Sequence, residues 1–126
     1  MNINAMNNYS NIVGAAMQAA VLRDNVISHN ISNADTPLFR RGDVAFETHL
    51  GHAVDNFRRT NQLDLTNVRP QVVRDFSDLR YRFDGNNVDI EAEMASLYQN
   101  SVRFDIMASG IMNHYRIINM VIGVQI

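Results

Sequence analysis

The C-terminal third of the chain carries a repeat of apolar residues that strongly limits its fold. Between residues 90 and 122, apolar side chains recur at alternating steps of four and three, and only Ser101 interrupts the row. A 3.5-residue spacing kept over several heptads is typical of a left-handed coiled coil, where one helix face stays against a partner helix. We therefore expect an assembly seam on one long helix, formed by Ile90, Met94, Leu97, Phe104, Ala108, Ile111, Tyr115, Ile118 and Ile122.

The predicted start of this helix is marked as clearly as its face. Asp89 can accept backbone N–H groups as the N-cap, and Glu91 and Glu93 place negative charge near the positive end of the helix dipole. We expect the C-terminal helix over residues 89–126, and its stretch from Asp89 to Ile122 would be about 50 Å long at 1.5 Å per residue.

The N-terminal segment, residues 1–35, shows similar stepping with polar exceptions at Ser10 and Asp24. Its row consists of Met6, Ser10, Val13, Met17, Ala20, Asp24, Ile27, Ile31 and Ala34. Apolar residues also cover its other faces, and a helix that is apolar on most sides is normally buried on most sides. We expect it to pair with the C-terminal helix as an antiparallel coiled coil.

One antiparallel partner cannot cover all of this apolar surface. The C-terminal helix has a second apolar row, which includes Tyr98, Val102, Ile106, Ile117, Val121 and Val124. Burying a large apolar side chain is worth about 1.5–3 kcal/mol, so leaving several in water is costly. We expect neighbouring subunits to cover them.

The middle segment, residues 36–88, has a different character. Phe46, Leu50 and Phe57 indicate a short amphipathic helix, with Asp43 as its expected cap. Residues 79–83 (LRYRF) alternate like a strand, and Asp84 with Gly85 favours a tight turn. The fold class is therefore mainly α, with a small β-hairpin or extended loop in the middle.

Residues 28–43, SHNISNADTPLFRRGD, form an expected helix stop. Short Ser, Asn and Asp side chains satisfy unpaired backbone groups at a helix end, and Pro37 prevents the helix from continuing. The Phe39, Arg40 and Arg41 side chains that follow are expected to pack against a neighbour.

Composition excludes several classes of function. The 126 residues suit one domain, and 11 basic residues against 13 acidic ones give a net charge of −2, so we expect no nucleic-acid partner. There is no Cys, and no apolar run reaches the roughly 18 residues of a spanning helix. We also expect no cleaved signal peptide.

The sequence contains few candidates for chemistry. His49 and His52 have a spacing that can hold a metal but lack a ligand pattern around them, while Ser28 and His29 point about 100° apart on a helix. The segment from Asp84 fails the calcium-loop pattern, because its sixth and twelfth positions are not Gly and Glu. We expect no catalytic residues, metal, cofactor or small-molecule substrate.

The helix-stop segment resembles the signature of bacterial flagellar axial proteins of the rod, hook and hook junction. That signature is close to N-N-I-A-N-A-[ND]-T-P-G-Y-K. The residues that match it are Asn30, Ile31, Asn33, Ala34, Asp35, Thr36 and Pro37, with Phe39 at the aromatic position.

Further similarities narrow the resemblance to the FlgB family of proximal rod proteins. Asp35 is typical of that family, Asp43 and Phe46 fit its D-V-x-F continuation, and residues 84–94 (DGNNVDIEAEM) are similar to its lead into the C-terminal helix. The resemblance implies that residues 30–46 contain an assembly motif. Leu38 stands where the family has Gly, so we expect no obligatory positive φ there.

The resemblance also implies a role and partners. It predicts a structural subunit at the proximal end of the rod that transmits torque and encloses the export channel. Its partners would be other copies, other rod proteins, the rod-to-membrane-ring adaptor and the export gate, in the periplasm. The alternatives are a sister rod subunit, a generic coiled-coil adaptor, or a small metal- or ligand-binding helical protein built on His49 and His52.

Overall fold

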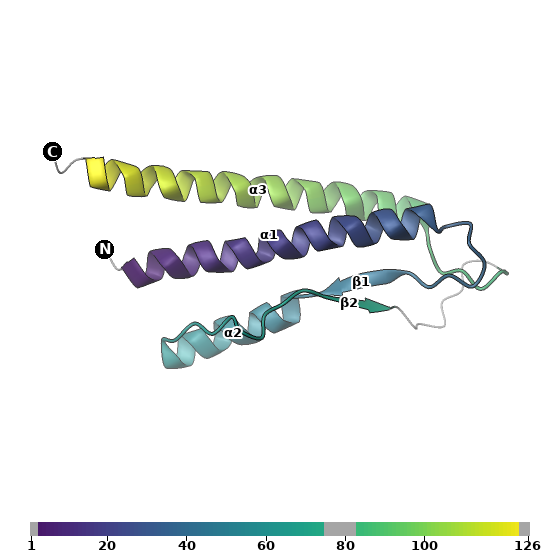
Figure 1. Cartoon of the computed structure of the whole chain (residues 1–126), viewed down its shortest axis with the longest axis horizontal. Helices are drawn as coiled ribbons and strands as arrows, with labels where there is room; N and C mark the ends of the chain where they lie inside the picture. Colours follow the sequence, from purple (N-terminus) through teal and green to yellow (C-terminus); the bar gives the residue numbers. More distant parts are fainter. Residues whose placement is uncertain (1–2, 75–82, 124–126) are drawn as a thin grey trace.

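The computed structural model describes residues 3–74 and 83–123, which form three helices and a two-stranded sheet. The elements are α1 (Ile3–Ser32), β1 (Gly42–Ala45), α2 (Glu47–Thr60), β2 (Gln71–Arg74) and α3 (Ile90–Gly123). Figure 1 shows α1 as the central layer, with the antiparallel α3 on one side and the strands with α2 on the other. The predicted fold class, with two long packed terminal helices and a small antiparallel strand pair, is confirmed. Within the described residues, no helix combines the length and apolar character needed to cross a membrane.

The predicted cap of α3 is confirmed. The Oδ1 atom of Asp89 accepts hydrogen bonds from the backbone N–H groups of Glu91 (3.0 Å) and Ala92 (3.2 Å). These donors have no partner inside the helix, so the carboxylate satisfies them and fixes where the helix begins.

The strands lie earlier in the chain than expected. β1 pairs with β2 in antiparallel register, with Gly42 opposite Arg74 and Ala45 opposite Gln71. The prediction that Asp43 caps the middle helix is wrong, because Asp43 lies in β1, where its Oδ1 accepts the Val44 N–H at 2.7 Å. Most of the strand predicted at residues 79–83 falls outside the described residues.

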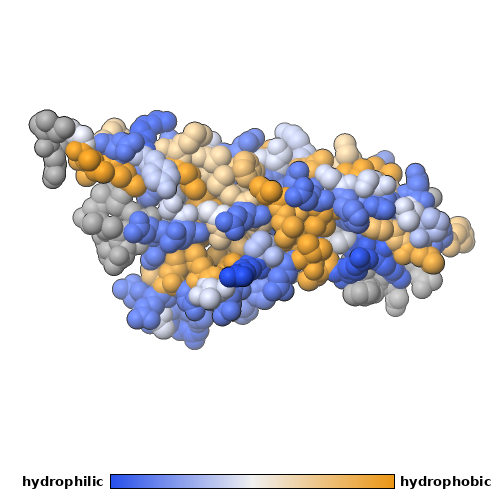
Figure 2. Space-filling view, viewed as in Figure 1, coloured by the Kyte–Doolittle hydropathy of each residue, from blue (hydrophilic) through white to orange (hydrophobic). Residues whose placement is uncertain are grey.

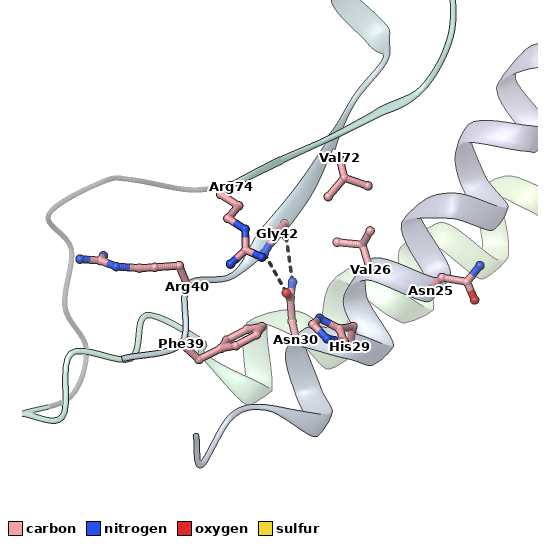
Figure 3. Close-up of a pocket in the computed structure, with 9 residues that line it drawn as sticks. All are labelled: Asn25, Val26, His29, Asn30, Phe39, Arg40, Gly42, Val72 and Arg74. Carbon is pink, nitrogen blue, oxygen red and sulfur yellow. Dashed lines mark hydrogen bonds between the residues drawn. The ribbon is translucent and has the colours of Figure 1, made fainter. Parts of the chain in front are cut away.

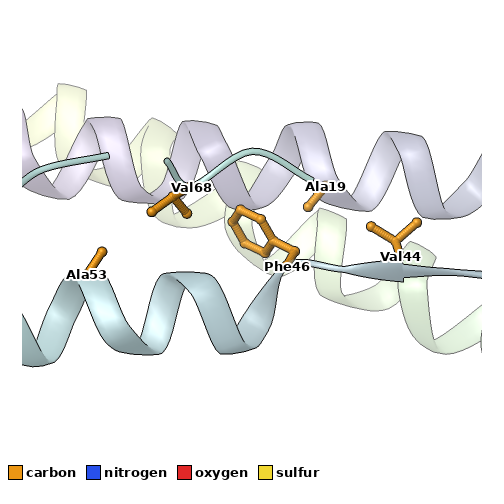
Figure 4. Packing of buried hydrophobic residues seen from close by; sticks show 5 residues of the cluster. All are labelled: Ala19, Val44, Phe46, Ala53 and Val68. Carbon is orange, nitrogen blue, oxygen red and sulfur yellow. The ribbon is translucent and has the colours of Figure 1, made fainter. Parts of the chain in front are cut away.

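The apolar core lies between α1 and the β-strand and α2 layer. Figure 4 shows its buried members, and partly buried side chains from α1 and α2 surround them. They are Ala19, Val44, Phe46, Ala53 and Val68. Because α1 also packs on α3, it is covered from two sides, which explains why apolar residues surround it.

The contact between α1 and α3 uses only part of the predicted seam. Leu97, Phe104, Ala108, Ile111 and Ile118 are half-buried, whereas Ile90, Met94, Tyr115 and Ile122 are 47–65% exposed. A different row of α3 completes the contact with α1. It lies one residue before the positions of Met94, Ser101 and Tyr115. Its side chains include Glu93, which accepts a hydrogen bond from Asn30, Asn100, which donates to the Ala20 carbonyl, and His114, whose ring packs against Tyr9 in a tilted arrangement. Three polar residues in that row conceal it from a hydrophobic pattern.

Leu38 contradicts the expectation about its turn. Its φ is +60°, in the left-handed region, and its N–H donates to the Asp84 carbonyl at 3.1 Å. Gly85, across this contact, also has positive φ, at +78°. A left-handed conformation costs a residue with a Cβ roughly 1–2 kcal/mol, so the tertiary contact holds Leu38 against its local preference.

We predict that Leu38→Gly raises the free energy of unfolding by about 0.5–1 kcal/mol, because release of this strain exceeds the entropy cost of a glycine. Leu38 is 78% exposed, so little packing is lost. Urea denaturation of the purified chain measures the change. Leu38→Ala keeps the strained φ and serves as control; a glycine variant less stable than the alanine variant would contradict the prediction.

Candidate functional site

Buried polar side chains gather where the end of α1, the start of β1 and the start of α3 meet. Asn30 and Asn86 are completely buried, Asn87 is 2% exposed and Glu93 is 3% exposed. Together with Arg41 they form a cluster that we name the polar joint. Buried polar groups are costly unless they are hydrogen-bonded, so their partners decide what this cluster does.

Asn30 joins α1 to the strand layer. Its Nδ2 donates to the Gly42 carbonyl at 2.9 Å and its Oδ1 accepts the Gly42 N–H at 2.8 Å, so the carboxamide pairs with the backbone in both directions. Figure 3 shows this pair at the edge of a cavity of about 220 Å³. A Cβ on Gly42 would lie 3.1 Å from Val26, which favours the small residue there.

Glu93 joins α3 to the same point. Its Oε2 accepts from Asn30 at 3.1 Å, and its Oε1 accepts from Arg41 Nε at 2.7 Å in a buried ion pair. Both carboxylate oxygens therefore have donors, which a buried carboxylate requires. The Arg41 backbone N–H donates to Asn87 Oδ1 at 2.7 Å, so the residue before β1 is held on two sides.

Asn86 holds the turn that follows α1. Its Nδ2 lies 2.9–3.1 Å from the carbonyl oxygens of Asn33, Ala34 and Thr36. Its Oδ1 accepts the Val88 N–H at 2.8 Å. These carbonyls belong to the turn that follows α1, so the Asn86 side chain ties that turn to a segment about fifty positions away in the chain.

The helix-stop prediction is confirmed at the end of α1. Ser32 Oγ and Asn33 Nδ2 both donate to the His29 carbonyl, at 3.0 and 2.9 Å, and Thr36 Oγ1 donates to Asn33 Oδ1 at 3.2 Å. These short side chains close the last turn, as their residue types predict.

The remaining residues of the predicted assembly motif divide between the interior and the surface. Ala34 and Phe46 are 3% exposed and Ile31 is half-buried, whereas Asp35, Pro37 and Asp43 are exposed. Phe39 packs against the His29 ring with centroids 5.4 Å apart.

Arg41 departs from the expectation that it points to a neighbour. Its guanidinium binds Glu93 inside the chain. From the sequence, Glu93 was expected only as a charge near the helix dipole, and Asn86 only as part of the segment that leads into the C-terminal helix. Their spacing from Asp89 and Gly85 gave no sign that they reach another element.

Ionisable groups outside the polar joint form no obvious reactive centre. His49 and His52 are exposed on α2, and the described parts of the chain contain no group of three or more His, Asp or Glu residues placed to hold a metal ion. Hydrogen bonds from the hydroxyl and backbone N–H of Thr66 hold the pKa of the Asp64 carboxyl below its usual value. The hydrogen-bonded groups of the polar joint, by contrast, hold α1, β1 and α3 together.

We predict that Glu93→Ala lowers the free energy of unfolding by about 3 kcal/mol, because it removes the buried carboxylate that pairs with Arg41 and accepts from Asn30. The value lies at the low end for buried pairs, since 26% of the Arg41 side-chain surface remains exposed. Denaturant unfolding measures it. Glu91→Ala, an exposed carboxylate in the same helical turn, should change stability by less than about 0.5 kcal/mol. Equal losses in the two variants would contradict a stabilising role for the buried pair.

Comparison with known proteins gives a consistent family. No protein-family model matches the chain. Flagellar basal body rod protein FlgB of Borrelia hermsii is 34% identical over 116 residues, covering 80% of this chain and 85% of that protein. FlgB of Borreliella burgdorferi is 33% identical with the same coverage, and FlgB of Escherichia coli is 28% identical over 109 residues, covering 76% and 79%. The chain therefore belongs to the FlgB family of flagellar basal body rod proteins.

Proposed function

We propose that this protein is a non-catalytic structural subunit of the flagellar basal-body rod that assembles through α1 and α3. Its relatives are named flagellar basal body rod proteins. The observation that carries the proposal is the amount of apolar side chain that α3 leaves exposed after it has packed on α1.

The exposed apolar residues of α3 continue over most of its length. Those from 39 to 73% exposed are Ile90, Met94, Tyr98, Val102, Ile106, Met112, Tyr115, Ile117, Met120, Val121 and Ile122. In Figure 2, hydrophobic side chains reach the surface near the C-terminal end of α3, and others do so below α3 in the middle of the face. Monomeric proteins rarely expose large continuous apolar patches, and helices packed side by side in a rod would cover this one.

The motif at residues 30–46 supports assembly from inside the subunit. Asn30, Arg41 and Glu93 fix the end of α1 against β1 and α3, so the two long helices leave this point with one relative register. Exposed Asp35, Pro37 and Asp43 remain on the surface, where a neighbour can contact them. We propose that the buried residues position the helices and that the exposed ones meet the next subunit.

The finer placement follows from the family resemblance. We propose that the subunit sits at the proximal end of the rod in the periplasm and leaves the cell without a cleaved signal. Its neighbours there would be other rod proteins, the rod-to-membrane-ring adaptor and the export gate. The long paired helices suit transmission of torque, since α1 and α3 stay in contact from the polar joint to the Tyr9–His114 pair.

We predict that Ile117→Asp blocks rod assembly while leaving the subunit folded. Ile117 is 48% exposed, so the free chain tolerates the carboxylate, whereas burial between subunits without a partner costs several kcal/mol. Electron microscopy of basal bodies from cells expressing the variant in place of the native chain measures assembly. Phe104→Asp and Ile111→Asp should also block assembly, but both residues are half-buried and would destabilise the subunit itself.

The control for this experiment is Thr48→Asp, which adds the same charge on the exposed side of α2. Normal rods and swimming are expected there. Normal rods with Ile117→Asp would contradict the proposed use of the α3 surface.

We also predict that the dilute isolated chain has less helix than α1 (30 residues) and α3 (34 residues) contain, because the helix ends lack their neighbours. Far-ultraviolet circular dichroism as a function of concentration measures this. Helix content that is complete at high dilution and unchanged on concentration would contradict it.

A further inference from the structure

Two grooves lie on opposite sides of the contact between α1 and α3. One, of about 240 Å³, is lined by Val21 and Asp24 of α1 and by Phe104 of α3. The other, of about 330 Å³, is lined by Arg103 and Ile106 of α3 together with residues of α1 and α2. We name them the Asp24 groove and the Arg103 groove.

The two grooves lie at the same level along the helix pair. Ala20 and Asn100 line both of them, and the Asn100 Nδ2 donates to the Ala20 carbonyl at 2.8 Å between them. A neighbour placed alongside with little axial displacement would therefore bring one groove opposite the other.

Each groove carries one exposed charged side chain that belongs to none of the ion pairs among the described residues, and the two charges have opposite signs. Asp24 and Arg103 are exposed, and neither has an ion-pair partner within residues 3–74 and 83–123. By contrast, Arg23 is bound to Glu47 at the edge of the Arg103 groove and cannot be the free cation there.

Exposed apolar side chains accompany both charges. Val21 is 52% exposed beside Asp24, and Ile106 is 66% exposed beside Arg103. Each face thus combines one apolar side chain and one charge, and the two faces are complementary to each other.

We propose that a second copy of this chain packs alongside the first, with its Asp24 groove against the Arg103 groove and an ion pair between Arg103 and Asp24 of the neighbouring copy. The proposal rests on the proposed function, in which copies assemble side by side. A two-fold contact through the same groove would place like charges opposite each other, which is unfavourable. When the Asp24 groove of one copy packs against the Arg103 groove of another, the pair still has one unused groove of each kind. Further copies can therefore add in the same direction.

Charge exchange tests the contact in cells that express the variant in place of the native chain. Asp24→Arg and Arg103→Glu alone should each lower the number of rods per cell by roughly tenfold or more, since each places like charges together. The double variant D24R/R103E restores the opposite pairing and should recover most of the rods. Singles that assemble normally, or a double variant no better than the singles, would overturn the proposal.

A matched control uses the exposed ion pair between Asp55 and Arg58 on α2, in which Arg58 Nη1 lies 3.5 Å from Asp55 Oδ1. Neither residue lines either groove. Asp55→Arg and Arg58→Glu make the same charge changes, and rod numbers should stay within about twofold of the native chain. Circular dichroism of each purified variant shows whether the subunit still folds.

Cysteine cross-linking tests the geometry directly, because the chain has no native Cys. In isolated rods, D24C/R103C should form a ladder of disulfide-linked multimers under oxidation, whereas neither single variant should form dimers. Dimers from a single variant would show a two-fold contact and overturn the proposal, as would the absence of any ladder in intact rods. If the native chain is missing from basal bodies altogether, the proposed function fails instead.

Discussion

The fold depends on how the buried carboxylate of Glu93 is compensated. A charged group that is 3% exposed must be paired, and its two partners come from segments 52 and 63 positions earlier in the chain. Arg41 cannot reach it unless the chain turns sharply after α1, and Asn30 cannot reach it unless α1 and α3 adopt one register. The sharp turn, the start of β1 and the helix pairing are therefore linked through one side chain.

This arrangement makes the two ends of the helix pair unequal. At the polar joint, donors and acceptors with fixed geometry hold α1, β1 and α3 together. Toward the termini, the polar and aromatic contacts include the tilted rings of Tyr9 and His114, with centroids 4.8 Å apart, and an exposed hydrogen bond between Ser10 and Tyr115. Such contacts specify register weakly, so the subunit is most firmly determined at the turn and most adaptable at its termini.

The sequence predicts elements whose signals are local, and it fails where a side chain acts on a distant element. The Asp89 cap, the closure of α1 by Ser32 and Asn33, and the two long helices follow from residue types and periodicity. β1 was missed because its four residues include only one large apolar side chain, Val44. The positive φ of Leu38 was missed because the strain is maintained by a backbone contact with Asp84 that no local pattern encodes.

The hydrophobic repeat was informative although four of its nine seam residues lie outside the contact between α1 and α3. The row through Leu97, Phe104 and Ile111 turns toward α1, while the row through Met94 and Tyr115 stays exposed. Packing of α3 on α1 explains only the row through Leu97, Phe104 and Ile111. The other positions of α3 that face α1 hold polar residues with partners in the same chain. The apolar repeat persists at positions that no residue within 3–74 and 83–123 covers, which has a physical reason if a helix of another subunit packs there. That requirement supports assembly more directly than any single residue does.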